Sequence, residues 1–166
     1  MTAPSTTPPA GLAAVKATIP HRHPIQLVDR VLEIVPDQRI VTVKAVSGNE
    51  PCYVSVPDGA TEADHAYPAA LLIESWCQSA ALLSAWSRPA DELADSVALF
   101  GGMSEVEVLA PVWPGDVVRH EVRVTRVVGE TWIFEGAATV GDVPVLAVAR
   151  VMTTLRPAWV LSGAPA

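Results

Sequence analysis

The 166-residue sequence predicts an α+β fold in which a curved antiparallel sheet wraps around one long helix. Residues 69–87 contain no glycine, no proline and a single charge, so about 28 Å of helix runs uninterrupted at about 1.5 Å per residue. Alternating polar and apolar runs, separated by turn signals, lie on both sides of this segment. The helix is apolar on every face, and only a sheet that curves around a single such helix can bury it.

The other elements follow from local patterns. Pro36-Asp37-Gln38 is a turn signal between two alternating runs, which indicates a hairpin before the long helix. Trp113-Pro114-Gly115-Asp116 and two Gly-acid pairs divide the later runs into a meander. The expected order is a disordered tail (1–11), a short helix (12–19), strands (26–34, 39–46), a long loop (47–64), the central helix (about 68–87), strands (96–100, 104–110, 116–128, 131–140, 143–155) and a C-terminal tail (157–166). Residues 12–156 are expected to form one domain.

Composition excludes several classes of function. The formal net charge of −7 makes a nucleic acid an improbable partner, and two cysteines do not make a disulfide framework. Glu74, Gln78 and several serines in the apolar helix argue against a membrane span. The first residues lack both a basic region and an apolar core, so no signal peptide is indicated and a cytoplasmic location is expected. No motif calls for a cofactor.

Glu74 is the residue that the apolar helix leaves unexplained. A carboxylate in such surroundings is costly unless it is paired, protonated or functional. Gln78 lies four residues on and therefore on the same face. A purely structural ion pair with an arginine is an equally good explanation from the residues alone. The backbone N–H groups of Ala69, Ala70 and Leu71 at the helix N-terminus can polarise a carbonyl, which would let Glu74 act as a general acid or base.

The four histidines offer few alternatives. His21 and His23 have the i, i+2 spacing of paired metal ligands on a strand, but no cysteine or carboxylate follows at ligand spacing, so no metal is expected. His65 lies just before the helix, where it would meet a substrate or simply belong to the loop. His120 lies among strand valines and arginines, as a structural residue does. Ser75 has no histidine at a nucleophile-motif spacing.

Three segments resemble the FabZ/FabA-type 3-hydroxyacyl-ACP dehydratases. Residues 19–51 contain PHR-P, LVDRV-E and NEP in the family's order, residues 67–83 contain E-x-x-x-Q in YPAALLIESWCQSAALL, and PVWPGD at 111–116 introduces closing strands that run to residue 155. The resemblance spans residues 12–156 almost completely. It implies a hot-dog fold, a dimer, and a substrate bound as a thioester to acyl carrier protein.

The resemblance also implies a catalytic site, of which this chain lacks one residue. In this family a histidine and a glutamate from opposite subunits remove water from the substrate. Glu74 matches the glutamate and Gln78 the family's glutamine. The histidine belongs to an HFPG motif in the preceding loop, and its register falls near Val56 or Ala60 here, so the chain lacks it. The chain is therefore expected to be a divergent member.

Three accounts of the missing histidine remain open from the sequence. In the first, Glu74 completes a composite site with the histidine of a different hot-dog subunit. In the second, His65 serves as the base in an active homodimer. In the third, the chain is a non-catalytic acyl-binding or structural subunit. A hot-dog thioesterase, which hydrolyses the thioester instead, is the rival from another class of reaction.

The sequence says less about the substrate. Leu71, Trp76 and Leu82 near Glu74 suggest space for an acyl chain, and Trp113 is a candidate for the entrance. Carrier proteins are typically acidic, so docking would need a local basic patch. The candidates for this patch, each equally an ordinary solvated charge, are Arg22, Arg88, Arg119 and Arg123. Fatty-acid and polyketide synthesis both fit, and the missing HFPG motif favours a specialised pathway.

Overall fold

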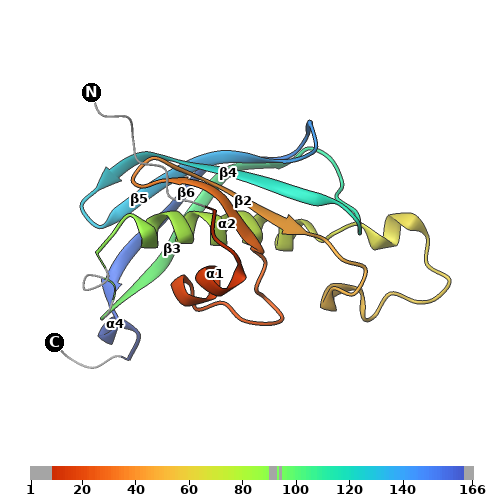
Figure 1. The fold of residues 1–166 in the computed structure, drawn as a ribbon, viewed down its shortest axis with the longest axis horizontal. Coiled ribbons are helices and arrows are strands. Elements are labelled where there is room, and N and C mark those ends of the chain that lie inside the picture. Colours follow the sequence, from red (N-terminus) through yellow and green to blue (C-terminus); the bar gives the residue numbers. More distant parts are fainter. Residues whose placement is uncertain (1–8, 90–92, 94, 163–166) are drawn as a thin grey trace.

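The computed structural model describes residues 9–89, 93 and 95–162, and it confirms the predicted fold class. One long helix, α2 (Ala69–Trp86), lies under a six-stranded antiparallel sheet with the strand order β1-β2-β4-β5-β6-β3 (Figure 1). The helix starts directly after Pro68 and ends before Pro89, at the two places where proline favours a helix boundary. No helix in the described ranges is long and apolar enough to span a membrane.

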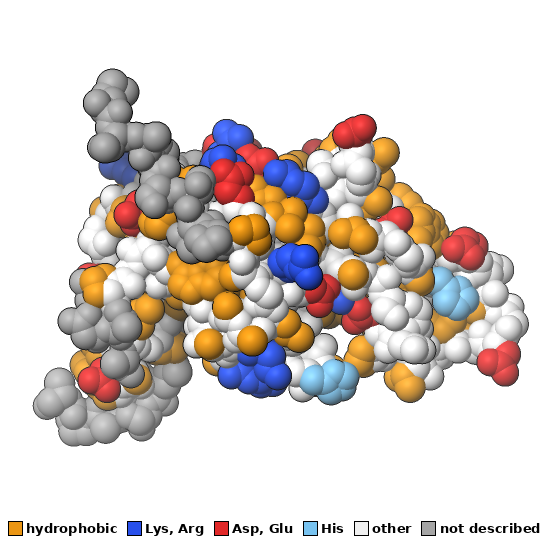
Figure 2. All heavy atoms as spheres, viewed as in Figure 1, with side chains coloured by type: hydrophobic (Ala, Val, Ile, Leu, Met, Phe, Trp, Pro, Cys, Tyr) orange, Lys and Arg blue, Asp and Glu red, His pale blue; other side chains and the backbone are white. Residues whose placement is uncertain are grey.

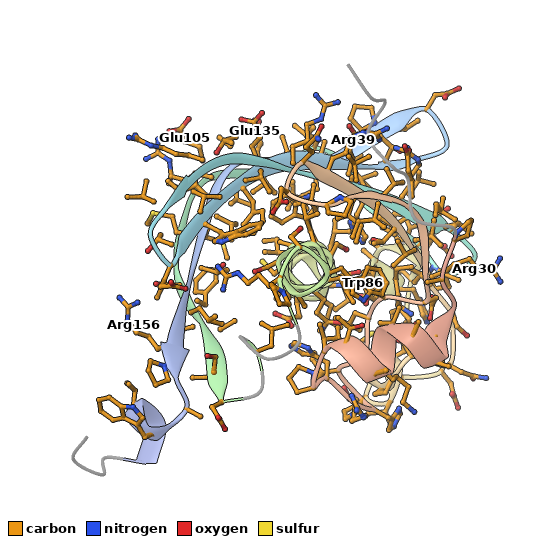
Figure 3. The ribbon with its side chains drawn as sticks, turned by 60° about the vertical axis from the view of Figure 1, so that its left-hand side comes forward. Arg30, Arg39, Trp86, Glu105, Glu135 and Arg156 are labelled. Carbon is orange, nitrogen blue, oxygen red and sulfur yellow. The ribbon has the colours of Figure 1, made fainter. Side chains whose placement is uncertain are left out.

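The sheet curves around α2 so that strands flank the helix on both sides. Seen along the helix, the sheet arches over α2, with β3 and β6 on one side and β1 on the other (Figure 3). The strands are β1 (Arg30–Val35), β2 (Arg39–Ala45), β3 (Ser96–Val108), β4 (Val117–Val128), β5 (Thr131–Val140) and β6 (Val143–Pro157). The short helix α1 (Leu12–Thr18) packs against α2 on the side that the sheet leaves open.

The core lies between α2 and the concave face of the sheet. Trp76 and Leu72 from the helix, and Phe134 and Val122 from the sheet, are buried there and belong to one cluster. On the outside, charged side chains of both signs lie among hydrophobic ones over the described part of the face in Figure 2. The apolar helix is thus buried as predicted, except along one face that includes Ile73, Glu74 and Cys77, which are only half-buried.

The first strand begins later than the sequence suggests. A strand is expected over 26–34, but β1 begins at Arg30. The reason is that the Leu27 backbone bonds to side chains of α2: its N–H donates to Gln78 Oε1 (3.0 Å) and its carbonyl accepts from Ser75 Oγ (2.7 Å). Residues before Arg30 therefore connect the helix to the sheet instead of extending a strand.

The strand after the helix is one element where two were expected. Gly101 and Gly102 suggest a break between 96–100 and 104–110, yet β3 runs through them and pairs with β6 along its length. The register shifts between Phe100 and Gly102, so the glycines form a β-bulge that bends the strand without ending it.

The ends and the long loop contain more structure than predicted. Ala10 forms a bridge with Val31, at the end of the expected N-terminal tail. In the expected C-terminal tail β6 reaches Pro157 and α4 (Trp159–Ser162) follows. The rest of the two expected tails, residues 1–8 and 163–166, lies outside the described residues. The loop contains two short 3-10 helices, η1 (Pro51–Tyr53) and η2 (Glu62–His65).

A buried polar layer joins α2 to the sheet. Thr42 Oγ1 and Ser79 Oγ are 2.7 Å apart, and Ser79 Oγ also donates to the Ser75 carbonyl. Ser75 Oγ lies 2.8 Å from His120 Nε2, while His120 Nδ1 is buried without a hydrogen-bond partner. Because Ser75 gives its proton to the Leu27 carbonyl, His120 Nε2 is the donor in its bond to Ser75, which places the imidazole proton on Nε2.

We expect stability to fall as the pH drops below about 6.5, because burial lowers the pKa of His120 to about 3, far below its ordinary value of about 6.5. Between those two pKa values the unfolded chain binds a proton on His120 that the folded chain excludes. The contribution of His120 to the free energy of unfolding is therefore fully present above the unfolded pKa. It is lost on acidification, by up to about 1.4 kcal/mol per pH unit. Urea unfolding from about pH 7.5 to about pH 5.5 measures this slope. A His120→Gln variant should show a shallower slope, and equal slopes would contradict the assignment.

Candidate active site

A cavity of about 470 Å³ opens along the half-buried face of α2. Cavities of roughly 300–1,000 Å³ are the usual size of small-molecule sites. Strands β3 and β6 form the opposite wall, and one residue comes from the segment between α1 and β1. The lining residues are Ala70, Ile73, Glu74, Cys77, Gln78 and Ala81 of α2, Ala98, Phe100 and Met103 of β3, Val151 and Thr153 of β6, and His21. The residues that line the cavity are largely apolar, and Glu74 is the acidic residue among them.

Gln78 fixes Glu74 and the segment before β1 at the same time. Its side chain is buried, with Nε2 donating to Glu74 Oε1 (2.9 Å) and to the Ile25 carbonyl (2.7 Å), while Oε1 accepts from the Leu27 N–H. Glu74 itself is 37% exposed on the cavity side. A carboxylate that is held by an amide and open to a cavity is available for proton transfer.

The structure brings His21 to Glu74, which the sequence did not predict. His21 Nε2 lies 3.5 Å from Glu74 Oε1, and both residues line the cavity. The sequence analysis considered His21 only as half of a metal-ligand pair with His23, and it expected no metal there. His21 and Glu74 are far apart in the chain, and no periodicity links them. The usable signal was the resemblance, whose PHR-P motif contains His21.

Cys77 contributes an apolar wall rather than a nucleophile. Burial raises the pKa of its thiol to about 12, and the nearby Glu74 carboxylate adds to the shift. Since the thiolate is the nucleophilic form of cysteine, Cys77 stays protonated and inert near neutral pH.

Of the other predicted site residues, Ala70 lines the cavity and the rest lie elsewhere. Ala69, Leu71 and Trp113 are not among the residues described above as lining it. The Leu71 N–H already donates to the Pro68 carbonyl (2.9 Å), so it is not a free donor for a substrate. Trp113 belongs to the turn before β4, where its N–H donates to Asp116 Oδ2 (2.8 Å).

His65 also lies away from this cavity within the protomer. It ends η2, in the yellow segment that projects beyond the sheet in Figure 1, and its Nδ1 lies 3.0 Å from the Thr61 carbonyl. Neither residue is among those that line the Glu74 cavity. If His65 is the base in an active homodimer, it would therefore have to reach the Glu74 of the other subunit.

The prediction about the apolar wall is wrong in its details. Trp76 and Leu82 are fully buried in the core and do not face the cavity. Trp76 Nε1 donates to the Glu121 carbonyl of β4, and both side chains belong to the core cluster, whereas the cavity lies along the half-buried face of α2. The apolar wall is made instead by smaller groups on that face and by side chains of β3, above all Phe100 and Met103.

All four candidate docking arginines make contacts within the chain, and those described for Arg22 are with backbone carbonyls alone. Arg119 and Arg123 both pair with Glu121 on the outer face of the sheet. Arg88 lies over the Trp132 ring, 4.9 Å from its centroid. Arg22 follows the cavity-lining His21 in the chain, and its guanidinium donates to the carbonyls of Lys16, Ile19 and His21.

We expect Gln78→Leu to lower the free energy of unfolding by about 2–3 kcal/mol, because it leaves the buried Leu27 N–H without an acceptor and breaks two further bonds. Hydrogen exchange should show faster exchange at the Leu27 amide. Gln26→Leu is the matched control, since Gln26 donates only to the neighbouring Val28 carbonyl in the contacts described, and its cost should stay below about 1 kcal/mol. Equal losses in both variants would contradict the role of Gln78.

Comparisons with known proteins agree with this fold. Residues 19–149 match the family of FabA-like domains. The chain is 36% identical over 144 residues to a 3-hydroxyacyl-[acyl-carrier-protein] dehydratase FabZ of Anaeromyxobacter sp. (strain K), covering 87% of this chain and 89% of that protein.

The solved structures that share the fold include the following two. One is the dehydratase heterocomplex ApeI:P from Xenorhabdus doucetiae (TM-score 0.69, 21% identity, 86% of this chain and 90% of that chain). The other is a hot-dog-like protein from Thermanaerovibrio acidaminovorans (TM-score 0.58, 22% identity, 75% and 84%).

The fold and the acidic, largely apolar cavity thus define a hot-dog protein with an enzyme-like site. The chain belongs to the FabZ/FabA-type 3-hydroxyacyl-ACP dehydratase family, as the resemblance implied.

Proposed function

We propose that the chain dehydrates 3-hydroxyacyl thioesters in the cavity beside α2, with Glu74 as one of the two proton-transfer groups. The observation that carries this proposal is a carboxylate, oriented by Gln78, at an apolar cavity large enough for an acyl chain. Dehydration needs a base for the C2 proton and an acid for the departing C3 hydroxyl. Glu74 supplies one of them, and the second group is the open part of the site.

The substrate is an acyl group carried as a thioester on acyl carrier protein. Support comes from the FabZ relatives, which are named as dehydratases of acyl-carrier-protein substrates, and from the apolar wall made by Phe100 and Met103. Arg22, which follows the cavity-lining His21 in the chain, offers a positive charge to an acidic carrier protein. Fatty-acid and polyketide synthesis both supply this class of substrate.

The chain works as a dimer, with itself or with a second hot-dog subunit. β3 is an edge strand whose Phe100, Met103 and Val108 expose apolar side chains, and two of the three also line the cavity. An exposed apolar edge calls for a partner. A partner with an intact HFPG motif would then deliver a histidine to Glu74. The fold neighbour ApeI:P is itself a complex of two different chains.

Product analysis tests the proposal. The purified chain, alone and with a candidate hot-dog partner, is incubated with a 3-hydroxyacyl thioester, and the products are identified by mass spectrometry. The proposal predicts an enoyl thioester that has lost one water. Release of free thiol and acid would instead identify a thioesterase. A chain that binds the acyl group but yields no product in any combination would be the non-catalytic subunit.

A further inference from the structure

We infer that His21 is the second proton-transfer group and that it acts with Glu74 of its own protomer. The inference rests on the proposed function and deepens it, because it names the group that replaces the family's missing histidine. It needs neither a histidine from a partner subunit nor His65.

The geometry of the pair carries the inference. His21 Nε2 lies 3.5 Å from Glu74 Oε1, and the two side chains are 29% and 37% exposed, so both are open to the cavity that they line. In a substrate the C2 hydrogen and the C3 hydroxyl are on adjacent carbons. Two groups this close together can therefore address both positions of one bound molecule.

Hydrogen bonds hold the segment that carries His21 against α2. Gln78 binds the backbone of Ile25 and Leu27 beyond His21, and Ser75 also binds Leu27. On the other side Arg22 donates to the carbonyls of three residues at the end of α1 and just after it, which are Lys16, Ile19 and His21. A proton-transfer group fixed in this way has a defined position relative to its partner.

The other histidines are placed less well for this step. His23 is exposed and does not line the cavity. His120 is fully buried in the core and bonded to Ser75. His65 lies in η2, outside the cavity of its own chain. Of the four histidines, only His21 touches both the cavity and Glu74.

The pair completes a balanced elimination. The Gln78 amide donates to Glu74 Oε1 and so orients the carboxylate, which acts as the base in this scheme. Glu74 takes the C2 proton, and the electrons of that C–H bond form the C2=C3 double bond. The C3–O bond breaks, and its oxygen takes a proton from the His21 imidazolium and leaves as water. The proton on Glu74 then passes to His21 across their contact, which restores both groups.

Single substitutions in the purified chain, with a 3-hydroxyacyl thioester of N-acetylcysteamine as substrate, test the inference. His21→Ala should lower kcat by about 10²–10⁴-fold with little change in KM, the usual range for one proton-transfer group. Added imidazole should restore part of this loss, because His21 is partly exposed and its loss leaves space at the cavity, whereas a purely structural role would show no rescue. His23→Ala and His65→Ala, in the same background, should stay within about twofold of the unmodified chain.

The outcomes separate this inference from the function on which it rests. If Glu74→Gln abolishes turnover but His21→Ala does not, the inference fails and the proposed function stands. The inference also fails if the chain is inactive alone and gains activity only with a partner that carries HFPG. An unmodified chain that dehydrates nothing, alone or with a partner, overturns the proposed function itself.

A spectroscopic measurement tests the contact without reference to activity. Nitrogen-15 NMR of the imidazole rings reports which ring nitrogen carries the proton and how that changes with the surroundings. Glu74→Gln should shift the signals of His21 and leave those of His23 unchanged. Unchanged His21 signals would show that the pair is not in contact in solution, and the inference would then be wrong.

Discussion

Glu74→Gln is expected to lower kcat for dehydration by about 10²–10⁴-fold and to leave the fold intact. Glutamine has the same shape and can still accept the hydrogen bond from Gln78 Nε2, but it cannot take or give a proton at neutral pH. Because Glu74 is 37% exposed, the substitution leaves no buried charge unpaired, so thermal stability should change little. Steady-state kinetics together with a thermal melt measure both effects.

Glu62→Gln is the control for this substitution. Glu62 is exposed in η2 and does not line the cavity. The Glu62→Gln protein should therefore have the same kcat as the unmodified chain. If Glu74→Gln kept full turnover with its product unchanged, Glu74 would not be a proton-transfer group, and both the proposed function and the role of His21 would lose their basis.

Gly136→Ala is expected to cost at least about 3 kcal/mol of folding free energy. Gly136 lies in β5 with φ at +156°, and a Cβ there would lie 2.0 Å from the Glu121 carbonyl oxygen and 3.2 Å from the Trp76 ring. Trp76 Nε1 donates to that same carbonyl (3.1 Å). The missing side chain thus lets β4, β5 and α2 meet, and alanine would force them apart.

Urea unfolding measures this cost, with Gly59→Ala as the matched control. Gly59 lies in the long loop, where an added Cβ meets nothing within 4 Å, so its substitution should change stability by less than about 0.5 kcal/mol. A Gly136→Ala protein as stable as the Gly59→Ala protein would mean that the strands can shift at no cost, contrary to the packing described for α2.

The parts of the fold that depend on local signals were predictable from sequence. The central helix was expected over about 68–87 and spans Ala69–Trp86, because its apolar run is bounded by prolines. The strand Thr131–Val140 has the predicted bounds, since glycine turns mark both of its ends. Prediction failed where tertiary contacts override local pattern, as at Leu27, whose backbone bonds to α2, and at Gly102, where a bulge preserves the strand.

The candidate site was predictable where it depends on local spacing within the helix and unpredictable where it depends on tertiary contacts. Glu74 and Gln78 stand out as polar residues in an apolar helix, and the four-residue spacing places them on one face. His21 could not be placed by spacing, because its contact with Glu74 depends on how Gln78 holds a distant segment. The cavity wall was misjudged because the helix is apolar all round, so sequence alone cannot tell which apolar face packs and which remains open.

Mixing two inactive variants tests most directly whether His21 and Glu74 act within one protomer. Glu74→Gln and His21→Ala chains are unfolded together, refolded and assayed. If each site takes both residues from one chain, every mixed dimer has two incomplete sites, and we predict no recovery of activity. If the residues came from opposite chains, one site in each mixed dimer would be intact, and roughly a quarter of the original activity would return. That recovery would contradict the account.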